Sequence, residues 1–173
     1  MKIFLLILGL GVLLVLVNAG CAAVRAGYSS APYQEVRTDG RFQLRDYPAL
    51  VVVETKDHGD DQSFMRLFHY IDRQNSAQTK IVMTTPVLMN GGSQRGTMSF
   101  VLPAALTVDR APQPTDAQLQ IKTLVAGRFA VLRFAGGIST SHETNALTRL
   151  QTWLQQSALT PEGGPIYGYF DPP

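Results

Sequence analysis

The sequence predicts an α+β fold in which a mostly antiparallel sheet curls around two helices. Short runs of β-branched and apolar residues, separated by turn residues, recur along the chain, whereas only two segments place apolar residues at helical spacing. Because the strands follow one another in groups rather than alternating with helices, an antiparallel sheet is favoured over a parallel one. The element order is close to a duplicated strand–helix–strand–strand unit, although the residues of the two halves hardly match.

A hairpin is predicted near the start of the folded part. Residues 33–37 and 42–46 flank Thr38-Asp39-Gly40-Arg41, and an Asp-Gly pair is a strong signal for a tight turn between antiparallel strands. The run ALVVVET at 49–55 is β-branched and apolar, so it predicts a buried strand.

A helix is predicted over residues 60–75. Its apolar residues recur at positions i, i+3, i+4 and i+7, which lie on one face of a helix: Phe64, Leu67, Phe68 and Ile71. Asp60 and Asp61 lie at its start, where carboxylates interact favourably with the helix dipole.

After the first helix, the sequence predicts further strands. Two strands are predicted over 81–89 and 97–102, joined by a glycine-rich turn. After a loop marked by prolines, the runs 119–125 and 129–134 predict a second hairpin across Ala126-Gly127.

A second helix and a last strand complete the prediction. Thr140 and Glu143 have the spacing of a capping box, which indicates a helix start. Leu147, Leu150 and Leu154 would form the apolar stripe of this helix. Residues 166–170 then predict the final strand.

The charge of the chain excludes one class of partner. Its 15 Lys and Arg residues nearly balance 13 Asp and Glu residues, which leaves a net charge of only +2. A nucleic-acid-binding protein would carry a strong basic patch, so we expect no nucleic-acid partner.

The N-terminus has the layout of a signal peptide over residues 1–20. Lys2 supplies a positive start, residues 3–17 an apolar segment that is too short for an ordinary membrane span, and Asn18-Ala19-Gly20 a small-residue end. Cys21 is the single cysteine of the chain. Ala19-Gly20-Cys21 resembles a bacterial lipobox, in which the cysteine becomes a lipid-bearing N-terminus.

This resemblance implies a lipidated tether over residues 21–32 and a membrane partner reached through Cys21. Ala22 is not the aspartate of an inner-membrane retention signal, so we expect the periplasmic face of the outer membrane. Asn18 stands where a lipobox usually has leucine. Two alternatives therefore stay open: cleavage by the ordinary peptidase, which gives a soluble periplasmic protein, and an uncut short anchor.

Three stretches together resemble the SOUL heme-binding protein family. The first is FQLRDYP at 42–48, which is similar to the family's early E-x-R-x-Y strand. The second is the segment 64–89, which ends in KIVMTTPVLM and is similar to the family's helix and its K-I-x-M-T-x-P-V strand. The third combines MSFVLP at 98–103 with AVLRFAG at 130–136. The likeness extends over about residues 33–171, and we expect residues 33–173 to form one domain.

The resemblance implies a distorted β-barrel flanked by two helices, with heme or another porphyrin bound non-covalently. Two departures qualify it. Asp46 stands where an animal-type member has a histidine proposed as an iron ligand, so that ligation does not carry over. The sequence reads Phe170-Asp171-Pro172-Pro173 where the family usually continues into a final strand. We therefore expect either a barrel that is open at one edge or a shortened member of the family.

The resemblance also implies where the ligand lies. A heme site needs a wide apolar wall, a rim of cations or donors, and a metal ligand such as histidine. The family's proposed pocket runs along the first helix, where this chain has the cofactor-binding candidates Phe64, Phe68, His69 and Met65. His69 is the candidate ligand of the heme iron.

Each candidate also has a structural explanation. Phe64 and Phe68 lie near the centre of the apolar face, where a helix needs them to dock on a core. A histidine on the flank of a helix commonly faces solvent, and His58 and His142 are expected at the surface.

No nucleophile elbow, zinc-protease motif, phosphate loop or dinucleotide fingerprint is present in the sequence. We therefore expect a tetrapyrrole carrier, buffer or sensor rather than an enzyme. Two alternatives stay open. A hydrolase or isomerase of small hydrophobic molecules would be favoured by a buried Glu or Tyr with a perturbed pKa in a cleft. A structural envelope lipoprotein would be favoured by a core without a cavity of roughly 300 Å³.

Overall fold

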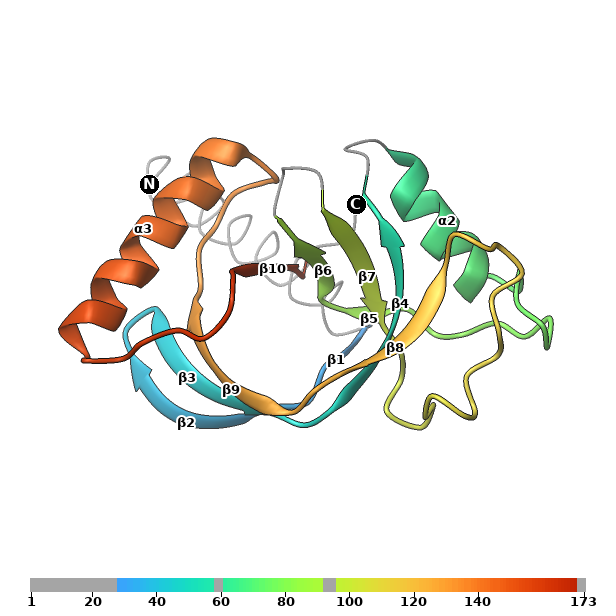
Figure 1. The fold of residues 1–173 in the computed structure, drawn as a ribbon, viewed down its shortest axis with the longest axis horizontal. Coiled ribbons are helices and arrows are strands. Elements are labelled where there is room, and N and C mark those ends of the chain that lie inside the picture. The colour runs from blue at the N-terminus through green and yellow to red at the C-terminus, as the bar shows by residue number, and fades with distance from the viewer. Residues whose placement is uncertain (1–27, 58–60, 92–95, 171–173) are drawn as a thin grey trace, which may run out of the picture.

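The computed structural model describes residues 28–57, 61–91 and 96–170 (Figure 1). The predicted signal peptide, Cys21 and most of the predicted tether lie outside these residues, as does His58. Within the described ranges, neither helix is long and apolar enough to cross a membrane.

Two antiparallel sheets form the body of the fold. The larger has the strand order β10-β6-β7-β4-β8, with bounds β4 (Leu50–Lys56), β6 (Val87–Asn90), β7 (Thr97–Val101), β8 (Gln120–Leu124) and β10 (Ile166–Tyr169). The smaller has the order β2-β3-β9, with bounds β2 (Gln34–Asp39), β3 (Phe42–Tyr47) and β9 (Gly127–Leu132). A short parallel pair joins β1 (Ser29–Ser30) to β5 (Thr84–Thr85).

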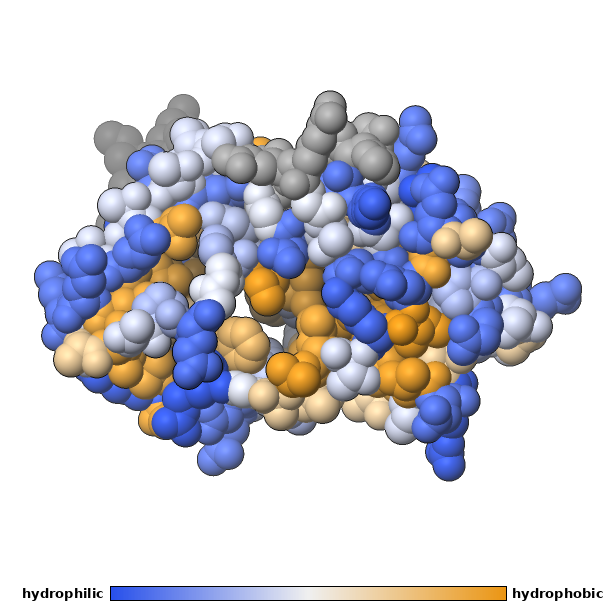
Figure 2. All heavy atoms as spheres, viewed as in Figure 1, coloured by the Kyte–Doolittle hydropathy of each residue, from blue (hydrophilic) through white to orange (hydrophobic). Residues whose placement is uncertain are grey.

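The two sheets are connected by two corners that lie side by side. Only two residues separate β3 from β4, and only two separate β8 from β9. Strand β3 pairs with β9 in one sheet while β4 pairs with β8 in the other, so both chain segments bend together from Tyr47 opposite Gly127 to Leu50 opposite Leu124. The strongly curled sheets form a distorted barrel that does not close, which confirms the predicted α+β class (Figure 1). Figure 2 shows apolar residues around an opening between the two halves on this face.

The predicted second hairpin is wrong. Strands β8 and β9 do not pair with each other, because β8 lies against β4 and β9 lies against β3. A two-residue hairpin reverses the chain, whereas Gly127 is itself the first residue of β9 and pairs with Tyr47. The short interruption at Val125 and Ala126 is therefore a corner between sheets and not a turn.

Two other boundaries differ from the prediction. The expected strand 81–89 is divided into β5 and β6 at Pro86, which has no N–H to donate to a strand ladder. The first helix, α2 (Asp61–Ile71), ends four residues before the predicted end at Asn75. The Asn75 amide donates hydrogen bonds to the carbonyl oxygens of Tyr70 (2.9 Å) and Thr79 (2.8 Å), which holds the chain in a turn after the helix.

The two helices flank the sheets at opposite ends of the molecule (Figure 1). Helix α2 packs on the large sheet, where its fully buried Leu67 and Tyr70 join a core cluster with Val53 and Phe100. Helix α3 (Thr140–Gln156) lies against the small sheet. Its Trp153 ring stacks on Phe42, with ring centres 5.2 Å apart, and the indole N–H donates to Asp39 Oδ2 at 3.0 Å.

Candidate functional site

The four residues predicted to bind a ligand all lie on α2, but they divide between its two sides. Phe64 is half-buried and packs against the core, where its ring meets the edge of Phe100 at a centroid distance of 5.2 Å. Phe68 follows one turn later and stacks on Phe64, with ring centres 6.4 Å apart and planes inclined by 15°. The inner side of α2 is thus occupied by packed side chains.

The outer side of α2 carries the other candidates. Met65 is 42% exposed and Phe68 is 40% exposed, and His69 is exposed beside them. Residues three and four apart are neighbours on a helix surface, so the three side chains form one patch, which we call the α2 flank (Met65, Phe68 and His69). Such a patch offers two polarisable apolar surfaces and an accessible imidazole.

Basic residues near the α2 flank are largely committed to ion pairs. Arg66 lies on the same helix, and its Nε is 2.8 Å from Asp116 Oδ2. Lys80 Nζ lies 3.6 Å from Asp72 Oδ1, and both side chains are well exposed. Arg73 is exposed in the turn after α2. A ligand carboxylate at this flank would meet Lys80 or Arg73 more readily than Arg66, which is held by Asp116.

Asp46, which stands where an animal-type SOUL protein has a histidine proposed as an iron ligand, takes part in an ion pair. Asp46 accepts two hydrogen bonds from Arg128 on the neighbouring strand, from Nε at 2.7 Å and from Nη2 at 2.8 Å. These bonds and the positive charge of Arg128 hold the pKa of Asp46 below its ordinary value. A cross-strand ion pair has replaced any metal ligand at this position.

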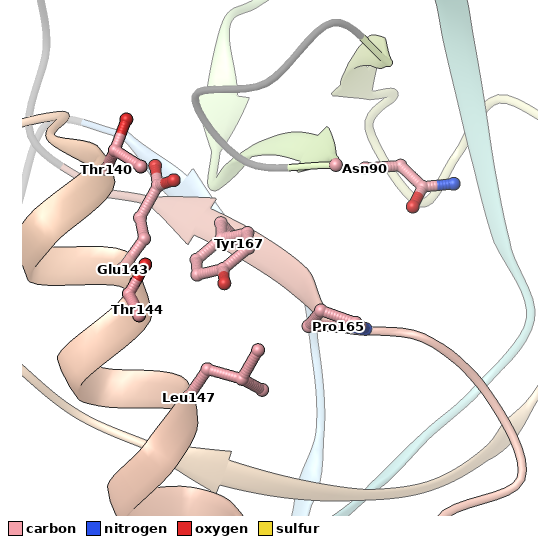
Figure 3. Close-up of a pocket in the computed structure, with 8 residues that line it drawn as sticks. Asn90, Thr140, Glu143, Thr144, Leu147, Pro165 and Tyr167 are labelled. Atoms are coloured by element: carbon pink, nitrogen blue, oxygen red, sulfur yellow. The ribbon is translucent and has the colours of Figure 1, made fainter.

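A pocket lies between α3 and β10, far along the sequence from the predicted site. Its volume is about 260 Å³. It is lined by Asn90, Gly91, Thr140, Glu143, Thr144, Leu147, Pro165 and Tyr167. Figure 3 shows the four α3 residues along one wall, facing Tyr167 and Pro165.

A buried carboxylate is the most polar feature of this pocket. Glu143 is 5% exposed and accepts a hydrogen bond from the Tyr169 hydroxyl. Burial raises the pKa of Tyr169, and the hydrogen bond to Glu143 raises it further. Burial, followed by the charge of Glu143, also raises the pKa of Tyr167. Both tyrosines therefore keep their protons at neutral pH and act only as neutral hydroxyls.

The sequence gives little sign of this site, because Glu143 has the spacing of a residue with a local capping role. The helix begins one residue earlier than the capping box requires, with Ser139 as its N-cap. Glu143 is instead used in a contact with Tyr169, 26 residues away. Tyr167 and Tyr169 alternate along the last predicted strand and so share one face, and this was the available sequence signal for a second polar cluster.

Across residues 28–57, 61–91 and 96–170, no three His, Cys, Asp or Glu side chains come together in a way that could hold a metal ion.

Comparison with protein families matches residues 28–173 to the family described as SOUL heme-binding protein. The match covers the whole described fold, including both corners, both helices and the α2 flank. No curated protein matches the chain.

Proposed function

The chain belongs to the SOUL heme-binding protein family, and from this premise we propose that it binds heme or a related porphyrin non-covalently at the α2 flank. The observation that carries the proposal is the family match together with an exposed histidine beside two exposed apolar side chains on α2. Single apolar residues at a surface are common, but two beside an accessible imidazole supply two of the components of a heme site, an apolar surface and a metal ligand.

The residues of the flank suit the parts of the ligand. Met65 and Phe68 would pack against the apolar macrocycle, and the stacked Phe64 would hold the Phe68 ring in place. His69 would ligate the iron. Lys80 or Arg73 would pair with the carboxylates. A bound heme supplies an iron with a further coordination position and a strong visible absorption, which suits a carrier, a buffer or a sensor.

The pocket between α3 and β10 is a poorer place for a macrocycle. Its volume of about 260 Å³ is below the range of roughly 300–1,000 Å³ that is usual for drug-sized ligands. A porphyrin also carries carboxylates, which the Glu143 carboxylate would repel. Size and charge thus both favour the α2 flank.

Titration of the protein with hemin tests this proposal. We expect a saturable Soret shift at about one ligand per chain, and we expect His69→Ala to move the Soret position and weaken binding. His142→Ala is the matched control, because His142 is also an exposed helical histidine but lies on α3. An unchanged spectrum in His69→Ala would reject His69 as the ligand, and the absence of saturable binding would reject heme binding itself.

We further propose that the protein is an envelope lipoprotein, anchored through Cys21 at the periplasmic face of the outer membrane. Support comes from the signal-like segment 1–20 and the lone cysteine that follows it. Several acyl chains on one cysteine would exceed the two-signal threshold for stable anchoring. Mass spectrometry of the protein from its own envelope should give residues 21–173 plus a lipid mass. The mass of an unmodified chain would reject the anchor.

An enzymatic role has one observation in its favour, because buried Glu143 lies beside two tyrosines in a pocket. The perturbed pKa of both tyrosines belongs to the same observation and meets the stated criterion, but its upward direction leaves Tyr167 and Tyr169 as hydrogen-bond donors. A tyrosine that stays protonated at neutral pH can donate hydrogen bonds but does not serve as a base. Binding therefore remains the function that we propose.

A further inference from the structure

We propose that the inside of the curled sheets holds a second ligand site, which takes an aromatic carboxylate. The carboxylate pairs with Arg45 on β3, and the aromatic body packs on the rings of Tyr33, Tyr47 and Phe129. This site is separate from the α2 flank and does not depend on heme binding. Three properties support it: the direction in which these residues face, the exposure of the rings, and the bonding of the Arg45 guanidinium.

The Arg45 side chain lies on the inner face of the sheets. Successive side chains of a strand point to opposite faces, and on β3 the Phe42 ring stacks on Trp153 of α3. Arg45 and Tyr47 therefore point away from α3. Tyr47 and Leu50 of β4 pack against one cluster, which is separate from the core cluster under α2, so the same face continues across the corner. Because the helices flank the curled sheets from outside (Figure 1), this face is the inner one.

The inner face is open to solvent at this position. Phe129 pairs with Arg45 across the strands and so shares its face, yet Phe129 is 40% exposed. Tyr33 contacts both Arg45 and Tyr47 and is 44% exposed. Side chains inside a small closed barrel fill its interior, so these exposed rings indicate a route from solvent to the inner face. Figure 2 shows an opening between the two halves of the molecule.

Three aromatic rings form a connected wall beside Arg45. The centroids of Tyr33 and Tyr47 are 5.4 Å apart, and those of Tyr47 and Phe129 are 5.6 Å apart. The Tyr33 ring also covers one face of the guanidinium, whose Cζ lies 4.1 Å from the ring centroid. Aromatic side chains offer large flat apolar surfaces that pack well on other rings. The wall therefore favours a flat aromatic body.

The Arg45 guanidinium is buried, and the groups bonded to it are neutral. The residue is 5% exposed. Nε, at 2.8 Å, and Nη2 both donate to Gln43 Oε1, and Nη1 donates to the Tyr47 hydroxyl at 3.1 Å. Glu35 lies opposite Arg45 on β2, but its carboxylate accepts from Gln43 Nε2 at 2.8 Å. In the part of the chain that the structure describes, no ion pair includes Arg45.

This buried cation selects an anionic ligand. A buried charge is costly unless an opposite charge compensates it, and a ligand carboxylate would supply that charge to Arg45. A guanidinium has five N–H groups, of which three take part in the bonds to Gln43 and Tyr47. Two N–H groups remain for a carboxylate, the anion whose shape fits a guanidinium best. Arg128 on the neighbouring strand differs, because it is exposed and already paired with Asp46.

Three probes of nearly equal shape test the charge requirement: trans-cinnamate, its neutral amide and its cationic amidine. Binding is measured by isothermal titration calorimetry on the intact protein, with amide chemical-shift changes in β3 and β9 to locate the site. We expect saturable binding of one trans-cinnamate per chain, clearly weaker binding of the amide and none of the amidine. Equal binding of all three, or no saturable binding of trans-cinnamate, would overturn the proposal.

Variants test the residue assignment. Arg45→Gln removes the charge, so trans-cinnamate affinity should fall about tenfold or more and the preference over the amide should disappear. Arg128→Gln removes the same charge from an exposed residue on the outer face and should bind as the parent does. Phe129→Ala truncates a partly exposed ring away from the Arg45 hydrogen bonds and should weaken the binding of trans-cinnamate and its amide alike. A preference for the carboxylate that persists in Arg45→Gln, or unchanged affinity in Phe129→Ala, would reject this face as the site.

Competition with hemin tests whether the two sites are separate. The α2 flank is on the outer side of α2, whereas Arg45 lies on the inner face of the small sheet. Saturating trans-cinnamate should therefore leave the Soret titration with hemin unchanged. Displacement of hemin by trans-cinnamate would show one shared site and overturn the second one, while the spectrum of His69→Ala reports separately on the α2 flank.

Discussion

Helices α2 and α3 occupy equivalent places in the two halves of the element order, yet they dock on their sheets in different ways. Helix α2 buries four of its eleven residues, three of which are large side chains of the core: Leu67, Tyr70 and Ile71. Helix α3 buries four of its seventeen residues, and one of these is Glu143. The first helix is held by large apolar side chains, whereas the second is held by Trp153 near its C-terminus and by the hydrogen bond from Tyr169 to Glu143 in its first turns.

The two helices differ in whether their inner face is filled by core side chains or borders a pocket. A helix whose inner face is filled by core side chains can offer a ligand only its outer flank, as α2 does with Met65 and Phe68. The first turns of α3 stand beside β10, joined to it by the hydrogen bond from Tyr169 to Glu143, and a pocket lies between them. The same supersecondary unit therefore gives a core in one half and a cavity in the other.

A matched pair of leucine truncations gives the largest expected effect on this comparison. Leu67→Ala removes a fully buried side chain from α2 and should reduce the free energy of unfolding by about 2–5 kcal/mol. Leu147→Ala enlarges a pocket that is already open, so its cost should be about 1 kcal/mol. Urea unfolding of both variants measures the difference. Equal costs would show that α3 is docked as firmly as α2 and would break the comparison.

The ion pairs of the two sheets provide a second, smaller contrast. In the large sheet, Glu54 has a side chain that is 6% exposed and accepts a bond from Lys122 Nζ at 2.6 Å. In the small sheet, the Asp46–Arg128 pair is exposed. Glu54→Gln should cost about 1–3 kcal/mol, because buried donors lose a charged acceptor. Asp46→Asn should have little effect, and added salt should reduce it further.

The pH dependence of stability tests the same contrast. Burial alone would raise the pKa of Glu54, but hydrogen bonds from Lys122, Ser99 and Thr97 outweigh it and hold the pKa below its ordinary value of 4.5. A carboxyl with a lowered pKa in the folded state stabilises fully above its ordinary pKa, and this contribution disappears as the pH falls through the folded value. The stability difference between the parent and Glu54→Gln should therefore be present at pH 7 and shrink towards pH 3. A difference independent of pH would assign it to packing rather than charge.

Local signals predicted the parts of the fold that local chemistry determines. Asp39-Gly40 predicted the β2–β3 hairpin, and Gly40 has the positive φ of 58° that such a turn requires. The spacing of Phe64, Leu67, Phe68 and Ile71 predicted the inner face of α2. The prediction is confirmed for Phe64, Leu67 and Ile71, whereas Phe68 is 40% exposed and lies outside the core cluster. The likeness to SOUL proteins was confirmed by the family match, whereas the role of His69 stays a prediction.

Features that depend on distant contacts could not be predicted in the same way. Ala126-Gly127 has the local pattern of a turn, and only the pairing of β8 and β9 with different partners makes this region a corner. Glu143 has the spacing of a capping residue, and only the position of Tyr169 on β10 turns it inward. The pocket is lined by residues from the end of β6, from α3 and from β10 with the residue before it, so no single segment of the sequence contains it.

The smallest predicted effect on the free energy of unfolding concerns the Thr55 hydroxyl, a buried polar group beside the α2 core. Thr55 lies two residues after Val53 on β4 and so shares its face toward the α2 core. The side chain is 2% exposed, and its hydroxyl has no hydrogen-bond partner in the described part of the chain. Thr55→Val keeps the shape and removes a buried hydroxyl that makes no bond, so it should raise the free energy of unfolding by up to about 1 kcal/mol.

The same substitution at a paired hydroxyl should have the opposite sign. Thr84 is also buried, but its hydroxyl donates to the carbonyl oxygen of Val101 at 2.5 Å. Thr84→Val leaves that carbonyl without the hydroxyl donor and should lower the free energy of unfolding by about 1–2 kcal/mol. Urea unfolding of the two variants under one condition decides the matter. If Thr55→Val destabilises as much as Thr84→Val, the Thr55 hydroxyl is satisfied in solution, and the α2 half is more polar inside than its apolar core cluster indicates.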